Sequence, residues 1–167
     1  TQPATGETYP KSDLFNKAIS ARRSNDITWL SSSMFKVMQK AVKNADVNPE
    51  DLCAIIPHAN GSSLSDKAEA NAIGMFTDGH VIPVLAWKGQ VGYTPTGSGI
   101  VDLIIGHHSL THNELISAVS NDTIIDAMAP YLLVDCGVIK HDKKHLLKTG
   151  VGVDGSIISA VLTQLDK

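Results

Sequence analysis

The sequence lacks an excess of basic residues, a long apolar run and a cysteine framework, and each absence excludes a class of function. Its 14 Lys plus Arg stand against 17 Asp plus Glu, which leaves no basic surface for phosphates, so we expect no nucleic-acid partner. The longest apolar stretches, such as residues 100–105, are far shorter than the roughly 20 residues of a membrane span, so we expect no membrane association. Cys53 and Cys136 form no CxxC pair, which favours a reducing compartment and a cytoplasmic location.

The chain also lacks an initiator methionine and a signal-peptide pattern at its start, since it begins at Thr1. We therefore expect that another segment preceded Thr1. A length of 167 residues with 43% hydrophobic residues predicts one globular domain. Residues 1–30 are rich in Pro, Gly and Ser and are expected to form a connecting surface segment, and residues 31–167 the folded part.

The folded part alternates between helical and strand patterns. Apolar residues recur at helical spacing from Ser33 onward, and any of the serines at 31–33 can supply the N-cap. Further on, we expect strands at 52–56 and 81–85, helices at 66–75 and 99–110, and closing strands at 131–134, 146–151 and 156–165. Residues 113–128 fit neither pattern clearly. This alternation predicts an α/β fold with a layered sheet and parallel strands.

The loop at 57–65 carries the first candidate site residue, His58. It follows the buried strand at 52–56, so its imidazole is expected to face a cleft, where it can transfer a proton or hydrogen-bond a carbonyl. The alternative is a histidine that only satisfies backbone groups of the loop. Asp66 and Glu69 have an equally simple explanation as acids that complement the dipole of the next helix, with Ser65 as its cap.

A second loop, at 87–99, is rich in glycine and contains Lys88, which can supply a fixed positive charge or a hydrogen-bond donor. The alternative is a simple turn. Neither GxxxxGK[ST] nor GxGxxG occurs, so we expect no nucleotide and no other cofactor.

Two groups of histidines are compatible with a metal site only by their proximity in sequence. They are His141 with His145, and His107 with His108 and His112. No cysteine or carboxylate completes a tetrahedral set at a familiar spacing, so we expect no metal. Neither cysteine has an evident activating base, so neither is a good nucleophile candidate.

Three motifs together resemble the C-terminal half of the β-ketoacyl synthases, a family with the thiolase fold. The stretch 58–66 matches the family pattern HGTxxPxND, with Glu69 in register and with Ala59 and Asn60 in place of Gly and Thr. The stretch 88–93 matches KxxxGH except that Tyr93 replaces the histidine. The turn 152–155 corresponds to GFGG. The resemblance covers residues 31–167 and implies the C-terminal half of a layered α-β-α fold.

The resemblance also implies roles for these residues. His58 and Lys88 correspond to the catalytic histidine and lysine of decarboxylative condensation, and Gly152, Val153 and Gly155 to a substrate-binding turn. Tyr93 takes the place of the second histidine. A tyrosine has a reference pKa of about 10 and is a poor substitute for imidazole in proton transfer, so catalysis by this chain is not expected.

Loss of that histidine is typical of the chain-length factor, the ketosynthase β subunit of type II polyketide synthases. The resemblance implies a non-catalytic chain that pairs with a ketosynthase α subunit and shapes the tunnel for a phosphopantetheine-linked polyketide on an acyl carrier protein. Because His58 is retained, a second interpretation stays open, in which the chain is the same half of a catalytically active β-ketoacyl synthase. A third is a stand-alone binding module. Because a thiolase fold needs two halves, we expect an N-terminal half as a further partner, held as a fragment cleaved from the same precursor.

Overall fold

The computed structural model describes residues 26–119 and 124–165. The connecting segment expected at 1–30 lies outside these residues up to residue 25. In chain order, the elements are α1 (Ile27–Asn44), the short 3₁₀ helix η1 (Pro49–Asp51), β1 (Leu52–Ile56), α2 (Ser63–Thr77), α3 (Lys88–Val91), α4 (Ser98–His112), β2 (Glu114–Ile116), β3 (Val138–Lys140), β4 (His145–Val151) and β5 (Ile157–Thr163).

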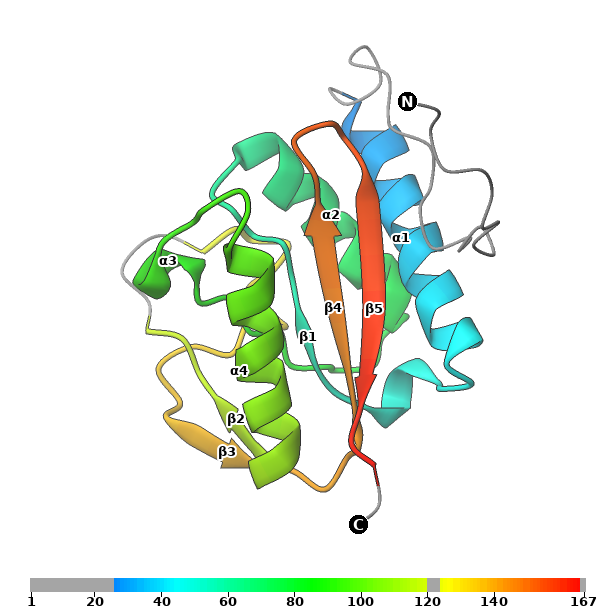
Figure 1. Cartoon of the computed structure of the whole chain (residues 1–167). Coiled ribbons are helices and arrows are strands. Elements are labelled where there is room, and N and C mark those ends of the chain that lie inside the picture. The colour runs from blue at the N-terminus through cyan, green and yellow to red at the C-terminus, as the bar shows by residue number, and fades with distance from the viewer. Residues whose placement is uncertain (1–25, 120–123, 166–167) are drawn as a thin grey trace, which may run out of the picture.

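A three-stranded sheet in the order β1-β4-β5 forms the centre of the described chain. β1 runs parallel to β4, and β4 runs antiparallel to β5. Helices α1 and α2 cover one face of this sheet and α4 covers the other, as Figure 1 shows. The predicted α/β class with a layered sheet is confirmed, although the sheet is mixed where parallel strands were expected.

The two faces of the sheet bury separate apolar clusters, because successive strand residues point to opposite sides. Ile55 and Leu147 pack in the cluster that α1 and α2 close. Their neighbours Ile56 and Leu146 belong to the second cluster, on the side of α4. A Cβ on Gly106 of α4 would lie 3.1 Å from Cδ1 of Ile56, so the glycine lets this helix approach the sheet closely.

The predicted N-terminus of the first helix is wrong. α1 begins at Ile27, and its N-cap is Asp26, whose carboxylate accepts a hydrogen bond from the backbone N–H of Trp29. The serines at 31–33 lie inside the helix. The hydroxyl of Ser31 donates a hydrogen bond to the carbonyl oxygen of Ile27, one turn earlier in the helix. Because the hydroxyl is bonded within the helix, it does not cap the free N–H groups of a helix N-terminus, the role in which serine is frequent.

Two further expected strands, 81–85 and 131–134, occur only as isolated bridges. Val84 bridges Ile55 on one side and Leu132 on the other, both in parallel orientation. Pro83 has no backbone N–H to donate, so the pairing of residues 81–85 does not extend beyond Val84 into a ladder. Residues 113–128, which fitted neither the helical nor the strand pattern, contribute β2. This strand pairs antiparallel with β3 outside the central sheet. The closing strands at 146–151 and 156–165 correspond to β4 and β5 and lie in the expected sheet.

Candidate functional site

A cavity of about 300 Å³ lies where the loop after β1, residues 88–95, β4, β5 and the N-terminal half of α4 meet. Its wall includes four of the residues that the sequence singled out: His58, Lys88, Tyr93 and Gly152. The remaining lining residues are Thr94, Pro95, Ser98, Gly99, Asp102, Leu103, Lys148, Thr149, Gly150, Val151, Ser156, Ile158 and Ala160. The three sequence motifs, which are separated by tens of residues in the chain, therefore meet in one place.

His58 lies immediately beyond β1 and is 7% exposed. Its backbone N–H donates to Oε1 of Glu69 at 2.8 Å, and that of Ala59 donates to Oε2 at 3.0 Å. Burial lowers the pKa of His58, with the nearby lysines adding to the effect and Glu69 opposing it. The imidazole is therefore neutral near pH 7 and can accept or donate one hydrogen bond.

Glu69 corrects a sequence-based explanation. Its carboxylate is 3% exposed and accepts hydrogen bonds from the His58 loop and from the hydroxyl of Thr149 on β4. It is a buried anchor between α2, the loop and the sheet, and not an acid that complements the helix dipole. The helix cap also differs from the prediction, because Ser62 precedes the first residue of α2 and Ser65 lies within the helix.

Lys88 is held beside His58 by a buried ion pair. Its Nζ lies 2.6 Å from Oδ2 of Asp102 and donates to the carbonyl of Pro57 at 3.4 Å. Asp102 comes from the first half of α4 and is 1% exposed. Sequence analysis missed Asp102, although a lone carboxylate within the apolar stretch 100–105 was a signal that could have found it.

A second buried lysine, Lys148, joins the same carboxylate. Its Nζ lies 2.9 Å from Oδ2 of Asp102 and 3.1 Å from the carbonyl oxygen of Pro57, and it also donates to the carbonyl of Thr149. Burial is the main cause that lowers the pKa of Lys148, and the charge of Lys88 adds to it. Sequence analysis missed this residue too, and its signal was a lysine inside the apolar strand 146–151.

Tyr93 faces His58 across the cavity. The two rings meet edge to face, with their centroids 5.7 Å apart. A phenol in this position can donate a hydrogen bond to a ligand, but at neutral pH it does not supply the proton transfer of an imidazole.

The predicted substrate-binding turn reaches the cavity only in part. Gly152 lies in the wall, whereas Val153 is 90% exposed and, like Gly155, is not among the residues that line the cavity. Gly155 has a φ of +80°, which the tight turn between β4 and β5 requires. A role of Val153 and Gly155 in substrate binding stays a prediction.

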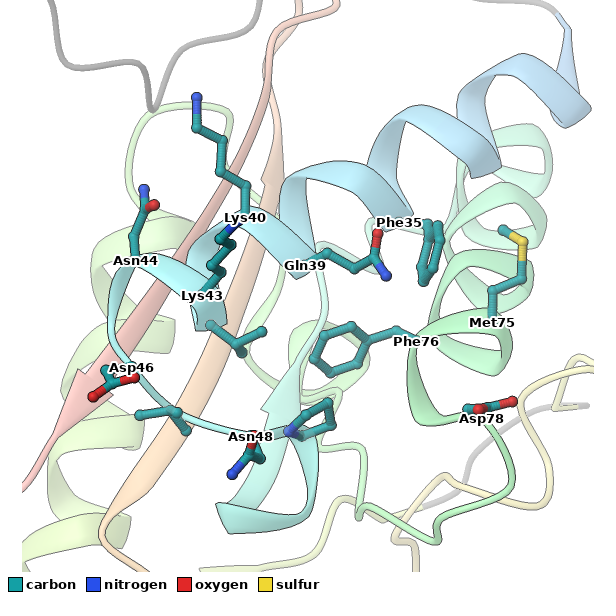
Figure 2. A pocket seen from close by; sticks show the side chains of 13 residues that line it. Phe35, Gln39, Lys40, Lys43, Asn44, Asp46, Asn48, Met75, Phe76 and Asp78 are labelled. Carbon is teal, nitrogen blue, oxygen red and sulfur yellow. The ribbon is translucent and has the colours of Figure 1, made fainter.

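A larger hollow of about 1090 Å³ lies elsewhere, between the C-terminal parts of α1 and α2. Phe35 and Gln39 of α1 face Met75 and Phe76 of α2 there, as Figure 2 shows. The wall of this hollow contains no histidine, cysteine or serine that could take part in acyl chemistry. The smaller cavity, which brings the motif residues together, is the candidate site.

A metal site, a nucleophilic cysteine and a membrane-spanning helix were also considered from the sequence. In the described part of the chain, no three His, Cys, Asp or Glu side chains are grouped so that they could hold a metal ion. Cys53 is buried, and burial raises the pKa of its thiol to about 12, so it is a poor nucleophile. Among the helices within residues 26–119 and 124–165, none combines the length and apolar character needed to cross a bilayer.

Curated sequence relatives are large fungal enzymes of which this chain matches a small part. The chain is 33% identical over 73 residues to the non-reducing polyketide synthase curS2 of Aspergillus terreus and 32% identical over 73 residues to Dhc5 of Alternaria cinerariae. Each match covers 41% of this chain and 4% of the relative. The chain therefore spans a small fraction of the length of these proteins.

Solved structures show the same fold over a larger part of the chain. The ishigamide ketosynthase/chain length factor superposes with a TM-score of 0.75 at 15% identity, over 81% of this chain and 34% of that one. A β-ketoacyl synthase from Burkholderia phymatum gives a TM-score of 0.73 at 18% identity, over 81% of this chain and 33% of that one. The predicted fold, the C-terminal half of a thiolase-like α-β-α architecture, is confirmed.

Residues 17–121 match the family described as "Beta-ketoacyl synthase, C-terminal domain". This match covers more than half of the chain and includes the His58 loop, Lys88 and Tyr93. The sequence family, the fold and the convergence of the motif residues on one cavity agree, and the chain belongs to the β-ketoacyl synthase C-terminal domain family.

Proposed function

We propose that this chain is the C-terminal half of a chain-length factor: it shapes a cavity for a growing poly-β-keto chain and does not catalyse condensation itself. The observation that carries the proposal is Tyr93, which faces His58 across the cavity at a ring separation of 5.7 Å. An imidazole at that position would complete a pair of histidines for decarboxylation, and a phenol does not.

The surroundings of the cavity support a binding role. The wall combines apolar and small side chains from α4 and β5, such as Leu103, Ile158 and Ala160, with charged groups. Such a wall suits a chain of alternating methylene and carbonyl groups, since the methylenes contact apolar atoms and the carbonyls accept hydrogen bonds.

Relatives support polyketide biosynthesis as the setting. The curated relatives are named as polyketide synthases, and one similar solved structure is a type II ketosynthase in complex with its acyl carrier protein, with a TM-score of 0.74 at 17% identity. We therefore propose three partners for this chain: a ketosynthase α subunit, a carrier protein that bears the phosphopantetheine-linked chain, and the N-terminal half of the thiolase fold.

The outer face of α4 supports the N-terminal half as a partner. Ile100 and Ile104 on this helix are 62% and 63% exposed, which is unfavourable for large apolar side chains grouped on one face. The half that completes the fold would cover them. Intact-mass analysis of native material is expected to find this chain with a second fragment or as part of a longer chain, and a monodisperse 17.8 kDa species would contradict the proposal.

Product length in the native complex tests the proposed function. Ala160→Phe fills part of the cavity and is expected to shift the products toward shorter chains while condensation continues. Val138→Phe is the control, because it places the same phenyl ring on β3, away from the cavity, at a residue that is 56% exposed. Unchanged product length in the Ala160→Phe complex, with its partners still bound, would contradict the proposal.

A catalytically active ketosynthase half is the second candidate, and the retained His58 is the observation in its favour. The residue is buried, is neutral near pH 7 and lies close to Lys88, as a group that hydrogen-bonds a thioester carbonyl must. If this function is the true one, His58→Ala abolishes condensation, whereas a chain-length factor with His58→Ala still supports condensation by its partner.

A further inference from the structure

Lys148 supplies a second ammonium beside an ion pair that is already complete. The same oxygen of Asp102 lies 2.6 Å from the Nζ of Lys88 and 2.9 Å from that of Lys148. Both lysines also donate to the carbonyl of Pro57. Two ammonium groups that share one carboxylate oxygen and one carbonyl lie close to each other, away from bulk water.

This arrangement favours the loss of one proton. Lys88 alone neutralises Asp102, so Lys148 can become a neutral amine without leaving a buried carboxylate unpaired. Lys88 repels the charged form of Lys148, whereas Asp102 and Glu69 favour it. His58 and the phenol of Tyr93 also face the cavity, and His58 is neutral near pH 7. Burial is the largest of these influences, and together they lower the pKa of Lys148.

A neutral amine in the wall of a cavity is a nucleophile toward carbonyl carbon, and desolvation and a neighbouring cation are the two devices that activate such lysines. We propose that Lys148 forms an imine with a ketone carbonyl of a β-dicarbonyl ligand in this cavity. For the nature of its ligand, a β-keto chain, the inference rests on the proposed function.

The step balances without an oxidant or a reductant. The nitrogen lone pair of Lys148 attacks the ketone carbon, an N–H proton passes to the former carbonyl oxygen, and the resulting carbinolamine loses water as the C=N bond forms. In a β-dicarbonyl compound the imine shifts a proton to become a conjugated enaminone, which resists hydrolysis better than a simple imine. The second carbonyl can accept a hydrogen bond from Lys88 or Tyr93, which line the same cavity.

Pentane-2,4-dione is a suitable probe, because it is the smallest stable β-diketone. The protein, in its native complex, is incubated with it near pH 7 and digested, and the peptides are analysed by mass spectrometry. The expected result is a gain of one diketone minus one water on Lys148, ahead of exposed lysines such as Lys67, because a lowered pKa leaves a larger fraction of the Lys148 amine neutral. Lys148 unmodified while Lys67 reacts would overturn the proposal.

Three variants sharpen the test. Lys148→Met removes the amine and leaves Lys88 to pair with Asp102, so labelling at this peptide should vanish, whereas Lys67→Arg on the surface of α2 should leave the labelling of Lys148 unchanged. Lys88→Met removes the repelling cation and should move the pH profile of labelling at Lys148 to higher pH. A profile unmoved by this change would contradict the role given to Lys88.

The wild-type peptide map decides the question even if a variant does not fold. Its result is also separable from that of the proposed function. Absence of label at Lys148 together with the expected shortening of products by Ala160→Phe would overturn only the imine, and label at Lys148 with unchanged product length would overturn only the chain-length role.

Discussion

The two faces of the central sheet are filled by different kinds of side chain. The face under α1 and α2 is closed mainly by apolar residues such as Met38, Ile55 and Ile73, all at 1% exposure or less, and its one buried carboxylate named above, Glu69, is held by hydrogen bonds. The face toward α4 buries an apolar cluster as well, but at the ends of β1 and β4 it also buries Asp102 and Lys148. The first face stabilises the fold mainly through apolar packing. The second face also holds charged groups beside a cavity, and burying these groups costs free energy.

The largest expected effect is at the charged face. Asp102→Asn removes the carboxylate from the buried side chains of Lys88 and Lys148 and should lower the free energy of unfolding by about 3–5 kcal/mol, since breaking a buried ion pair leaves charge uncompensated. Urea denaturation measures the change. Asp126→Asn, at an exposed position, is the matched control, and equal effects of the two substitutions would contradict a charged cluster that depends on Asp102.

A substitution on the apolar face sharpens the contrast. Ile73→Ala on α2 should cost about 2–5 kcal/mol of stability, because a fully buried side chain leaves a cavity. It should not alter the reaction of Lys148 with pentane-2,4-dione under conditions where the protein stays folded. If Ile73→Ala changed that reaction as much as Lys88→Met does, the two faces would not be independent.

The pH dependence of stability tests the environment of His58. The pKa of this residue is lowered in the folded state, so its contribution to stability is complete above the unfolded value of about 6.5 and is lost as the pH falls through the lower folded pKa. Between about pH 7 and pH 5, His58→Gln should therefore lose less stability than the wild type. His80→Gln, at an exposed histidine, is the matched control.

The smallest expected effect concerns Ala59, which has a φ of +37° where the family pattern has glycine. A side chain in the left-handed region is strained, so Ala59→Gly should raise the free energy of unfolding by up to about 1 kcal/mol. Ala45→Gly is the control, because Ala45 has a φ of −86° and no strain to relieve. A loss of stability in Ala59→Gly equal to that in Ala45→Gly would show that the loop does not store this strain.

The contrast between the two faces of the sheet also explains which parts of the fold and of the site could be predicted from the sequence. The apolar face was predictable because periodicity depends on neighbours in the chain, and α2 and β1 were placed within a few residues. His58, Lys88 and Tyr93 were found because the motifs that carry them are local. Lys148 and Asp102 were missed because their importance comes from a contact between β4 and α4, across 46 residues of sequence.

Strand pairing was harder to predict than strand pattern for a similar reason. Residues 81–85 and 131–134 have apolar, strand-like compositions, but they pair only through isolated bridges, at Val84, Leu132 and Val134. Whether such a segment extends into a ladder depends on the donors of distant segments and on local breaks such as Pro83, which a count of apolar residues does not include.

Release of carbon dioxide from a malonylated carrier protein, measured in the complex with the proposed ketosynthase subunit, tests the central claim most directly. If this chain shapes the cavity without catalysing the reaction, His58→Gln leaves the rate of release unchanged, and without the ketosynthase subunit there is no release. A fall in the rate by about 10² or more in His58→Gln, the size expected for loss of a catalytic acid or base, would contradict the account.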